Sequence, residues 1–359
     1  MEREKFKSRL GFILISAGCA IGIGNVWKFP YMVGTNGGGI FVLFYLIFLA
    51  IMGVPIMSME LSIGRASRKS TVRAYQELEK PGTKWHLHGY VAMAGNYILM
   101  MFYTVVTGWM IYYFYLFLTG KFDGASTEQV VASYEQMLGS PGILTVTMLI
   151  VVISGFFICS FGLQSGVERV TKWMMVALLV IMVFLAFYSF TMPGAAEGLK
   201  FYLVPDMKQV KEIGLLNIIT AAMNQSFFTL SLGIGAMLIF GSYLGEGRTI
   251  LGEAKNIAIL DTFVAIVSGL IIFPACFSFG VSPDAGPSLI FKTLPNIFAS
   301  MTGGRIFGSF FFLFLFFASF STIIAVFEGR RRGGRGGRGG GPAEVGEWSP
   351  SPWARAGWH

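Results

Sequence analysis

Residues 16–30, SAGCAIGIGNVWKFP, form an apolar stretch that Gly22 and Gly24 interrupt and Pro30 ends. The chain around this stretch is 54% hydrophobic and 13% charged, with a mean hydropathy of +0.65. Soluble domains carry roughly 25% charged residues, so we expect an all-α membrane protein. Inside a bilayer, backbone that leaves the helix is tolerated only where it is buried in protein or lines a polar cavity. The break therefore predicts a site where freed carbonyls bind a cation and freed N–H groups bind an anion.

Eight apolar segments are long enough to span a membrane. They lie at about 11–34, 40–64, 89–118, 141–160, 167–190, 214–243, 257–281 and 304–327. Basic residues gather before the first segment and in the connection 65–84, which predicts a cytoplasmic N-terminus. Within that connection, residues 70–80 have the pattern of a short amphipathic helix along the same face. The connections 119–140 and 191–213 then lie outside the cell.

The sixth segment repeats the break of the first. Thr229, Ser231, Gly233 and Gly235 lie in the middle of the apolar stretch 214–243. Two interrupted helices five spans apart predict an inverted repeat, with the first unit at about 11–190 and a partial second unit at about 214–328. The alternative is that these small residues only permit close helix packing.

The sequence changes character at Gly329. From there to the end it is rich in Arg and Gly, with six Arg and two Glu, and no packed core is possible. We interpret residues 1–328 as the transmembrane domain and 329–359 as a disordered tail from a shifted reading frame, and we expect no nucleic-acid partner. Cys19, Cys159 and Cys276 all lie in apolar segments, so they are interpreted as core residues rather than disulfides or metal ligands.

Several strings resemble the sodium-dependent neurotransmitter and amino-acid symporters. They run in order from GNVWKFPY at 24–31 and NGGG at 36–39 through ELSIGR at 60–65 and QSFFTLS at 225–231 to FASFST at 317–322. The resemblance covers about residues 5–328 and implies a LeuT-type fold unwound in spans 1 and 6. That family has eleven or twelve spans, of which eight are present. The resemblance further implies a multi-pass protein of the bacterial cytoplasmic membrane that carries a small solute with sodium, and not an enzyme.

The resemblance also implies two sodium sites, and sodium binds well to carbonyl oxygens of unwound backbone. The expected ligands of site 1 are the Ala20 carbonyl and the side chains of Asn25, Thr229 and Asp261. The expected ligands of site 2 are the carbonyls of Gly18, Ile21 and Ala318 and the hydroxyls of Ser321 and Thr322. The alternative for the two hydroxyls is a hydrogen bond to their own helix.

Some members of that family bind chloride near the first sodium site. Tyr45 and Gln225 match part of that chloride pattern, but Ala265 stands where a further hydroxyl is expected. A carboxylate at the depth of Asp261 needs a partner, and sodium is one. We therefore expect Asp261 to supply the negative charge and transport to be chloride-independent.

The resemblance places an amino-acid pocket between the two breaks. Gly22 leaves room for the substrate's own carboxylate, which favours an amino acid over a simple amine, and the lining is apolar enough for a hydrophobic or aromatic side chain. The expected pocket residues are Ala20, Gly22, Ile23, Gly24, Leu99, Tyr103, Val106, Phe228, Thr229, Ser231, Ile234 and Ile323.

Gate residues are implied in the same way. Tyr103 and Phe228 resemble the outer lid, while Lys28 and Arg3 resemble one half each of the outer and inner ion pairs. Their usual partners fall in spans that this chain lacks, so we expect impaired turnover.

The sequence offers two alternative functions. A proton-coupled carrier or channel would use Glu60, Glu168 and Asp261, although Glu60 and Glu168 are expected to pair with Arg65 or Arg169. A hydrolase is disfavoured because His86, His88 and His359 all lie outside the expected spans, where none can serve as the base for a membrane-embedded nucleophile.

Overall fold

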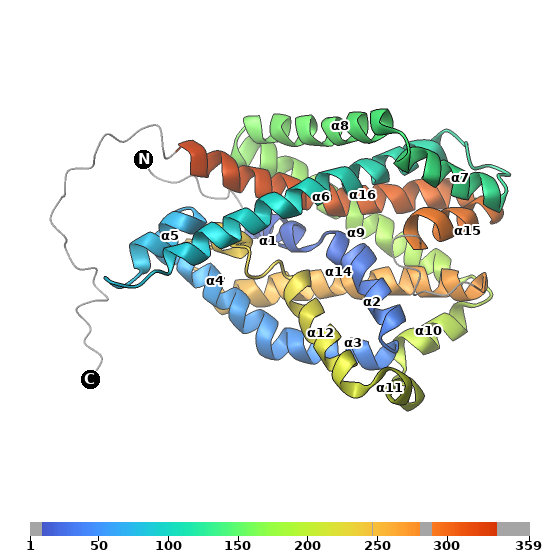
Figure 1. Cartoon of the computed structure of the whole chain (residues 1–359), viewed down its shortest axis with the longest axis horizontal. Helices are drawn as coiled ribbons and strands as arrows, with labels where there is room; N and C mark the ends of the chain where they lie inside the picture. The colour runs from blue at the N-terminus through green and yellow to red at the C-terminus, as the bar shows by residue number, and fades with distance from the viewer. Residues whose placement is uncertain (1–8, 246, 281–288, 336–359) are drawn as a thin grey trace.

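The computed structural model describes residues 9–245, 247–280 and 289–335, and these residues are almost entirely helical (Figure 1). Within these ranges the only extended pairing is one isolated bridge between Gly38 and Pro205. An all-α membrane fold is therefore confirmed.

In the part of the chain that the structure describes, six apolar helices are long enough to cross a membrane. They are Gly39–Ser67 (α3 Gly39–Phe48, η2 Leu49–Gly53 and α4 Val54–Ser67), α6 His86–Leu118, α8 Pro141–Ser160, Gly166–Phe190 (the end of η3 Leu163–Glu168 with α9 Arg169–Phe190), α14 Ile250–Ser278 and α16 from Gly304 to Phe327 of its full length Gly304–Arg335.

The remaining two predicted spans are both broken. In the first, α1 (Arg9–Ala20) is followed by the π-helical turn η1 (Gly24–Lys28) and α2 (Phe29–Thr35), with a bend of 54°. In the second, α12 (Leu215–Thr229) and α13 (Ala236–Gly241) are separated by a non-helical segment. The breaks coincide with the glycines that mark them in the sequence.

Short elements connect the spans. They are α5 Thr71–Leu78, α7 Thr127–Leu138, α10 Ala195–Leu203, α11 Met207–Ile213, η4 Leu289–Thr293 and α15 Leu294–Ser300. The predicted helix at 70–80 corresponds to α5. Beyond α5, the Glu79 carboxylate accepts hydrogen bonds from the backbone N–H and Nδ1 of His86, at 3.0 and 2.8 Å. Desolvation by burial raises the pKa of Glu79, but these hydrogen bonds outweigh it and hold the pKa below its ordinary value.

The packing brings the two broken spans into the centre of the bundle. Helix α16 lies along α6 and also contacts α1 and α9, while α14 contacts α1, α4, α9 and η1 (Figure 1). Helix α12 packs on α3 and α13 packs on α4. The break in the first span is therefore enclosed by α6, α14 and α16.

Two helix boundaries differ from the sequence expectation. Helix α14 begins at Ile250 rather than near 257, because the polar residues Glu253 and Asn256 in its first turns give it a weak apolar signal. Helix α16 continues past the boundary expected at 328 as far as Arg335, since each added residue extends a formed helix by one hydrogen bond. The expected tail beyond that point, 336–359, lies outside the described residues.

Close packing of α13 on α4 depends on two glycines. A Cβ atom on Gly64 would overlap the Leu238 carbonyl oxygen, and one on Gly241 would overlap the Leu61 carbonyl oxygen. Neither neighbour is a flexible side chain, so the helices would have to separate.

We expect Gly64→Ala to lower the melting temperature of the detergent-solubilised protein, because an overpacked contact costs about 1–3 kcal/mol. Gly142→Ala is the matched control, since Gly142 lies in α8 with open space at its Cβ position. The control should be neutral or slightly stabilising, because alanine favours a helix. Equal melting temperatures of the two variants would contradict the proposed contact.

Candidate functional site

The break in the first span exposes backbone groups next to α6. The Gly22 carbonyl accepts the N–H groups of Asn25 and Val26 at 3.1 and 3.3 Å. The Ile23 N–H donates to the Tyr103 hydroxyl at 2.9 Å. A Cβ on Gly22 would overlap that hydroxyl and come within 2.8 Å of Thr322 Oγ1. Glycine is therefore required for this approach of span 1 to α6 and α16.

The break in the sixth span is held by side chains from α4, α5 and α6. Ser231 has a φ of 52°, a left-handed conformation that is rare for a non-glycine residue. The Gly233 N–H donates to Glu60 Oε1 and Asn96 Nδ2 donates to the Ile234 carbonyl, each at 2.6 Å. The Thr71 hydroxyl donates to the Gly235 carbonyl at 3.4 Å.

Glu60 was expected to pair with Arg65, and this prediction is wrong. Arg65 instead donates to the Arg248 carbonyl at 2.7 Å. Glu60 turns toward the broken span because a buried N–H group without a partner is costly, and the Gly233 N–H has lost its helical acceptor. Glu168 is buried beside α9.

Asn25, Thr229 and Asp261 meet in what we call the carboxylate cluster. Asn25 Nδ2 donates to Thr229 Oγ1 at 3.0 Å and to Asp261 Oδ1 at 2.8 Å. Thr229 Oγ1 donates to Asp261 Oδ2 at 2.9 Å. All three residues have no exposed surface. Elements η1, α12 and α14 thus place three of the four residues expected for sodium site 1 in direct contact, while Ala20 ends α1 nearby.

The carboxylate cluster fits a bound cation. No Lys or Arg of the described ranges forms an ion pair with Asp261, and an isolated buried carboxylate is strongly unfavourable. The assignment of the Asn25 amide atoms follows from the hydrogen-bond network. Asn25 Oδ1 accepts the Gly22 N–H at 3.2 Å, which fixes this orientation of the amide. The buried charge of Asp261 is therefore what a bound cation balances.

Ser321 and Thr322 form a second set of contacts with span 1, which we call the hydroxyl cluster. The Ser321 hydroxyl lies 2.8 Å from the Gly18 carbonyl oxygen and 2.9 Å from that of Ala318. The Thr322 hydroxyl lies 3.2 Å from the Gly18 oxygen and 3.3 Å from those of Cys19 and Ile21. All residues expected for sodium site 2 therefore converge. The hydrogen bonds of both hydroxyls extend to span 1 as well as to their own helix.

Protons are scarce in the hydroxyl cluster. Each hydroxyl has one proton to donate, and together they face the carbonyl oxygens of Gly18, Cys19, Ile21 and Ala318. Oxygen lone pairs therefore outnumber donors in a site that is almost fully buried. A hard cation such as sodium satisfies that excess, as unwound carbonyls do in related ion sites.

A cavity of about 260 Å³, the central cavity, lies between the two breaks. Of the predicted pocket residues, those lining it are Ala20, Gly24, Leu99, Tyr103, Phe228, Ser231 and Ile234. Five others do not line it: Gly22, Ile23, Val106, Thr229 and Ile323. Gly95, Ile98 and Leu232 line it without having been predicted, and Thr322, predicted as a sodium ligand, lines it as well. Gly95 and Ile98 could have been found from helical periodicity, since Gly95 precedes Leu99 by four residues and Ile98 follows Gly95 by three.

Two of the predicted gate residues, Lys28 and Phe228, contact each other. Lys28 Nζ lies 3.4 Å from the centroid of the Phe228 ring, and Phe228 lines the central cavity. A cation over an aromatic face is attracted by the ring. Arg3 lies outside the described residues.

An ion pair that the sequence reasoning missed joins α1 to α14. Arg9 Nε lies 3.0 Å from Glu253 Oε1, and Arg248 Nη1 lies 3.9 Å from the same oxygen. Glu253 is 2% exposed. Arg9 and Glu253 are 244 residues apart in the sequence, so no local pattern indicates their contact.

The residues expected at the chloride position are also buried. Tyr45 has no exposed surface, and its ring lies 4.9 Å from that of Phe29. Gln225 Nε2 donates to the Gly24 carbonyl at 3.1 Å, while its Oε1 has no hydrogen-bond partner in the described part of the chain. Gln225 therefore links α12 to the break in span 1.

The sequence profile described as the sodium:neurotransmitter symporter family matches residues 3–135 and 126–331. The chain belongs to this family. It is a sodium-coupled transporter and not an enzyme, as the sequence predicted.

Similar proteins support the assignment. An uncharacterized sodium-dependent transporter of Bacillus subtilis, YhdH, is 34% identical over 324 residues, which cover 90% of this chain and 71% of the relative. The sodium-dependent serotonin transporter of Drosophila melanogaster is 27% identical over 87% of this chain and 56% of its own length.

A solved structure extends the likeness to the fold. The crystal structure of MhsT in complex with L-phenylalanine matches with a TM-score of 0.82 and 39% identity, covering 91% of this chain and 73% of the other. The LeuT-type fold is thereby confirmed. The chain is a multi-pass membrane transporter that couples a solute to sodium.

We expect Gly22→Ala to weaken sodium-dependent solute binding at least tenfold, equivalent to about 1.4 kcal/mol, because the added methyl displaces the Tyr103 hydroxyl. Gly95→Ala is the control: Gly95 lines the same cavity but has open space at its Cβ position. Equilibrium binding of a radiolabelled amino acid to the purified variants measures both. Equal affinities would contradict the role of Gly22.

Proposed function

We propose that this protein imports an amino acid with a hydrophobic or aromatic side chain, coupled to two sodium ions and independent of chloride. The observation that carries the proposal is the pair of buried oxygen clusters on the two sides of one apolar cavity. Both clusters and the cavity share the broken backbone of span 1. A change in that backbone alters the binding of the ions and of the solute together, and coupling requires this.

The polar ends of the cavity suit an amino acid. Tyr103 and the helix that starts after Gly22 can accommodate a carboxylate, since helix N-termini favour anions. Ser231, whose hydroxyl lies 3.4 Å from the Cys19 carbonyl oxygen, stands with the Ala20 and Phe228 carbonyls on the side suited to an ammonium group. A simple amine would leave the carboxylate position empty.

The remainder of the cavity suits an apolar side chain. Leu99, Ile98 and Ile234 line it, and the Phe228 ring covers one side. MhsT, whose fold this chain shares, was crystallised with L-phenylalanine. We infer the same chemical class for this protein.

The proposed path runs toward the cytoplasm at the α5 end of the bundle. Basic residues gather at that end, which favours a cytoplasmic location in a bacterial inner membrane. The Arg9–Glu253 ion pair lies at the start of α1 and α14. We infer that it closes the inner side, a role that the sequence analysis assigned to Arg3.

A substitution at Asp261 tests the first sodium site. We expect Asp261→Asn to lower the apparent sodium affinity roughly tenfold or more, because a carboxylate ligand becomes a neutral amide. The measurement is sodium-dependent binding of L-phenylalanine with sodium replaced stepwise by potassium. Thr262→Val is the control, since the Thr262 hydroxyl bonds its own helix at the Ala258 carbonyl.

Chloride is tested on the unaltered chain. Replacement of chloride by gluconate should leave L-phenylalanine binding and uptake unchanged. Loss of uptake in gluconate would contradict the charge role of Asp261. Uptake into liposomes driven by a pH gradient without sodium would favour a proton-coupled carrier instead.

Ser321 and Thr322 test the second sodium site. The double variant Ser321→Ala with Thr322→Val removes both hydroxyl oxygens, so we expect sodium to support binding only at concentrations at least tenfold higher. Ser319→Ala is the control in the same helix, because the Ser319 hydroxyl bonds the α16 carbonyls of Leu315 and Phe316. An unchanged sodium dependence of the double variant would contradict the site.

A further inference from the structure

One hydroxyl belongs both to the central cavity and to the hydroxyl cluster. Among the described residues of that cluster, only Thr322 also lines the central cavity. Its Oγ1 lies among carbonyl oxygens of span 1 and α16, while its side chain forms part of the cavity wall. Thr322 is therefore the place where an ion in the cluster and a solute in the cavity can affect each other.

The two hydroxyls of the cluster are held differently. Ser321 Oγ lies 2.8 and 2.9 Å from the carbonyl oxygens of Gly18 and Ala318, which are ordinary hydrogen-bond lengths. Thr322 Oγ1 faces four carbonyl oxygens at 3.2 to 3.5 Å. It has one proton for all of them. The Thr322 hydroxyl is therefore loosely held and can change its partner at little cost.

The Tyr103 hydroxyl is one of the partners of Thr322. It accepts the Ile23 N–H at 2.9 Å, so its own proton needs a different acceptor. The Thr322 hydroxyl is its side-chain hydrogen-bond partner, and a Cβ atom on Gly22 would contact both hydroxyls. A carbonyl oxygen is a better acceptor than a phenol. Thr322 therefore donates its proton to the carbonyls and accepts the proton of Tyr103.

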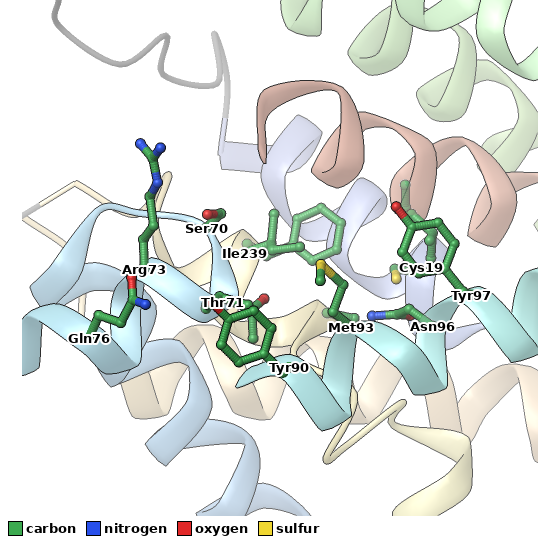
Figure 2. Close-up of a pocket in the computed structure, with 15 residues that line it drawn as sticks. Cys19, Ser70, Thr71, Arg73, Gln76, Tyr90, Met93, Asn96, Tyr97 and Ile239 are labelled. Carbon is green, nitrogen blue, oxygen red and sulfur yellow. The ribbon is translucent and has the colours of Figure 1, made fainter. Parts of the chain in front are cut away.

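This pair of hydroxyls faces only one of the two cavities beside span 1. A second cavity, of about 450 Å³, lies at the α5 end of the bundle, and the Cys19 side chain is part of its wall (Figure 2). The Cys19 carbonyl oxygen instead lies 3.3 Å from Thr322 Oγ1. Neither Tyr103 nor Thr322 lines the second cavity. The pair is thus available to a solute in the central cavity and not to one at the α5 end.

A sodium ion in the hydroxyl cluster changes the hydrogen bonds of this pair. The ion occupies lone pairs of Thr322 Oγ1 and of the carbonyl oxygens around it. The Thr322 proton then points away from the ion, and its nearest remaining acceptor is the Tyr103 hydroxyl. Once Tyr103 accepts from both Ile23 and Thr322, its own proton has no acceptor in the protein. A buried donor without a partner is costly, so this proton attracts an anion in the central cavity.

We propose that sodium in the hydroxyl cluster reverses the hydrogen bond between Thr322 and Tyr103 and so turns the Tyr103 proton toward the carboxylate of the amino acid. The chain of contacts has a cation at one end and an anion at the other, so its hydrogen bonds polarise one another. By linkage, the carboxylate strengthens sodium binding by the same factor. The proposal rests on the proposed sodium-coupled amino-acid transport and assigns the coupling of the second sodium site to these two residues.

The number of sodium ions bound with each solute molecule tests the proposal on the purified full chain. That number is the slope of the logarithm of L-phenylalanine affinity against the logarithm of sodium concentration, with potassium as the replacing ion. The unaltered chain should give a slope of about two. A slope of one or less would contradict the two-sodium function and the coupling that rests on it.

Tyr103→Phe separates coupling from simple contact, because it removes the hydroxyl and none of the expected sodium ligands. We expect the slope to fall to about one, since the second sodium ion no longer affects the solute. If Tyr103 only contacts the solute, affinity falls equally at every sodium concentration. An unchanged slope of two would therefore overturn the proposal and leave the proposed function standing.

Tyr113→Phe is the matched control. Tyr113 lies on the same helix, is buried, and donates its hydroxyl proton to the Phe291 carbonyl at 2.7 Å. It does not line the central cavity. This variant should keep the slope of the unaltered chain. An equal fall in both variants would overturn the specific role of Tyr103.

A second measurement uses the unaltered chain and a changed solute. L-phenylalaninamide keeps the ammonium group and the ring but carries a neutral amide in place of the carboxylate. Its slope, from displacement of radiolabelled L-phenylalanine, should be lower by about one ion or more, because a neutral group favours the reversed hydrogen bond less. Equal slopes for the two solutes would overturn the carboxylate as the group that receives the Tyr103 proton.

Two variants of Thr322 test its hydroxyl apart from its methyl group. Thr322→Ser keeps the hydroxyl and should keep a slope of about two, whereas Thr322→Val keeps the shape and should give about one. A slope of one in both variants would overturn the role of the hydroxyl, and so would a slope of two in both.

Discussion

The structure depends on one constraint: backbone that leaves a helix inside the bundle must find partners for its N–H and C=O groups. Span 1 meets it with the Tyr103 hydroxyl, the Gln225 amide and the Ser321 and Thr322 hydroxyls. Span 6 meets it with Glu60, Asn96 and Thr71. Apart from Gln225, which lies in the first half of the broken span 6, these side chains come from continuous helices, so the breaks are supported by rigid elements. The broken segments can then carry function without loss of the fold.

Partners for carbonyls and partners for N–H groups are unevenly supplied. Around span 6, a carboxylate, an amide and a hydroxyl serve the freed groups. Around span 1 and α16, several carbonyl oxygens face only two hydroxyls. An oxygen-rich site of this kind attracts a cation, and the same holds where Asp261 meets Asn25 and Thr229. The ion preference thus follows from how the backbone is satisfied.

The same backbone separates two cavities. Cys19 and Ala20 lie on opposite sides of the layer formed by span 1, and Ile234 and Ala236 do so in span 6. The residues that brace the span 6 break, Asn96 and Thr71, also line a second cavity, of about 450 Å³, at the α5 end of the bundle. The Arg9–Glu253 ion pair fastens α1 to α14 at the same end of the bundle.

Most of the fold follows from local sequence. Apolar length located the spans, and the glycines at 22, 24, 233 and 235 located the breaks, because glycine and a lack of helical pattern are local properties. The motif strings also identified the residues of both oxygen clusters before any geometry was available. The boundaries of α14 and α16 were less well predicted, since charged or glycine-rich ends resemble connections.

Pairings between distant residues required the tertiary structure. Glu60 carries a charge that suits Arg65 nearby on the same helix, yet it binds Gly233 because that N–H group has lost its helical acceptor. The Arg9–Glu253 ion pair and the approach of Asn96 to Ile234 likewise join segments with no local relation. The sequence by itself determined which segments are apolar, where they break and which oxygens are available to a cation. Only the packing of the helices decided which unpaired group meets which side chain, because that choice depends on distances across the bundle.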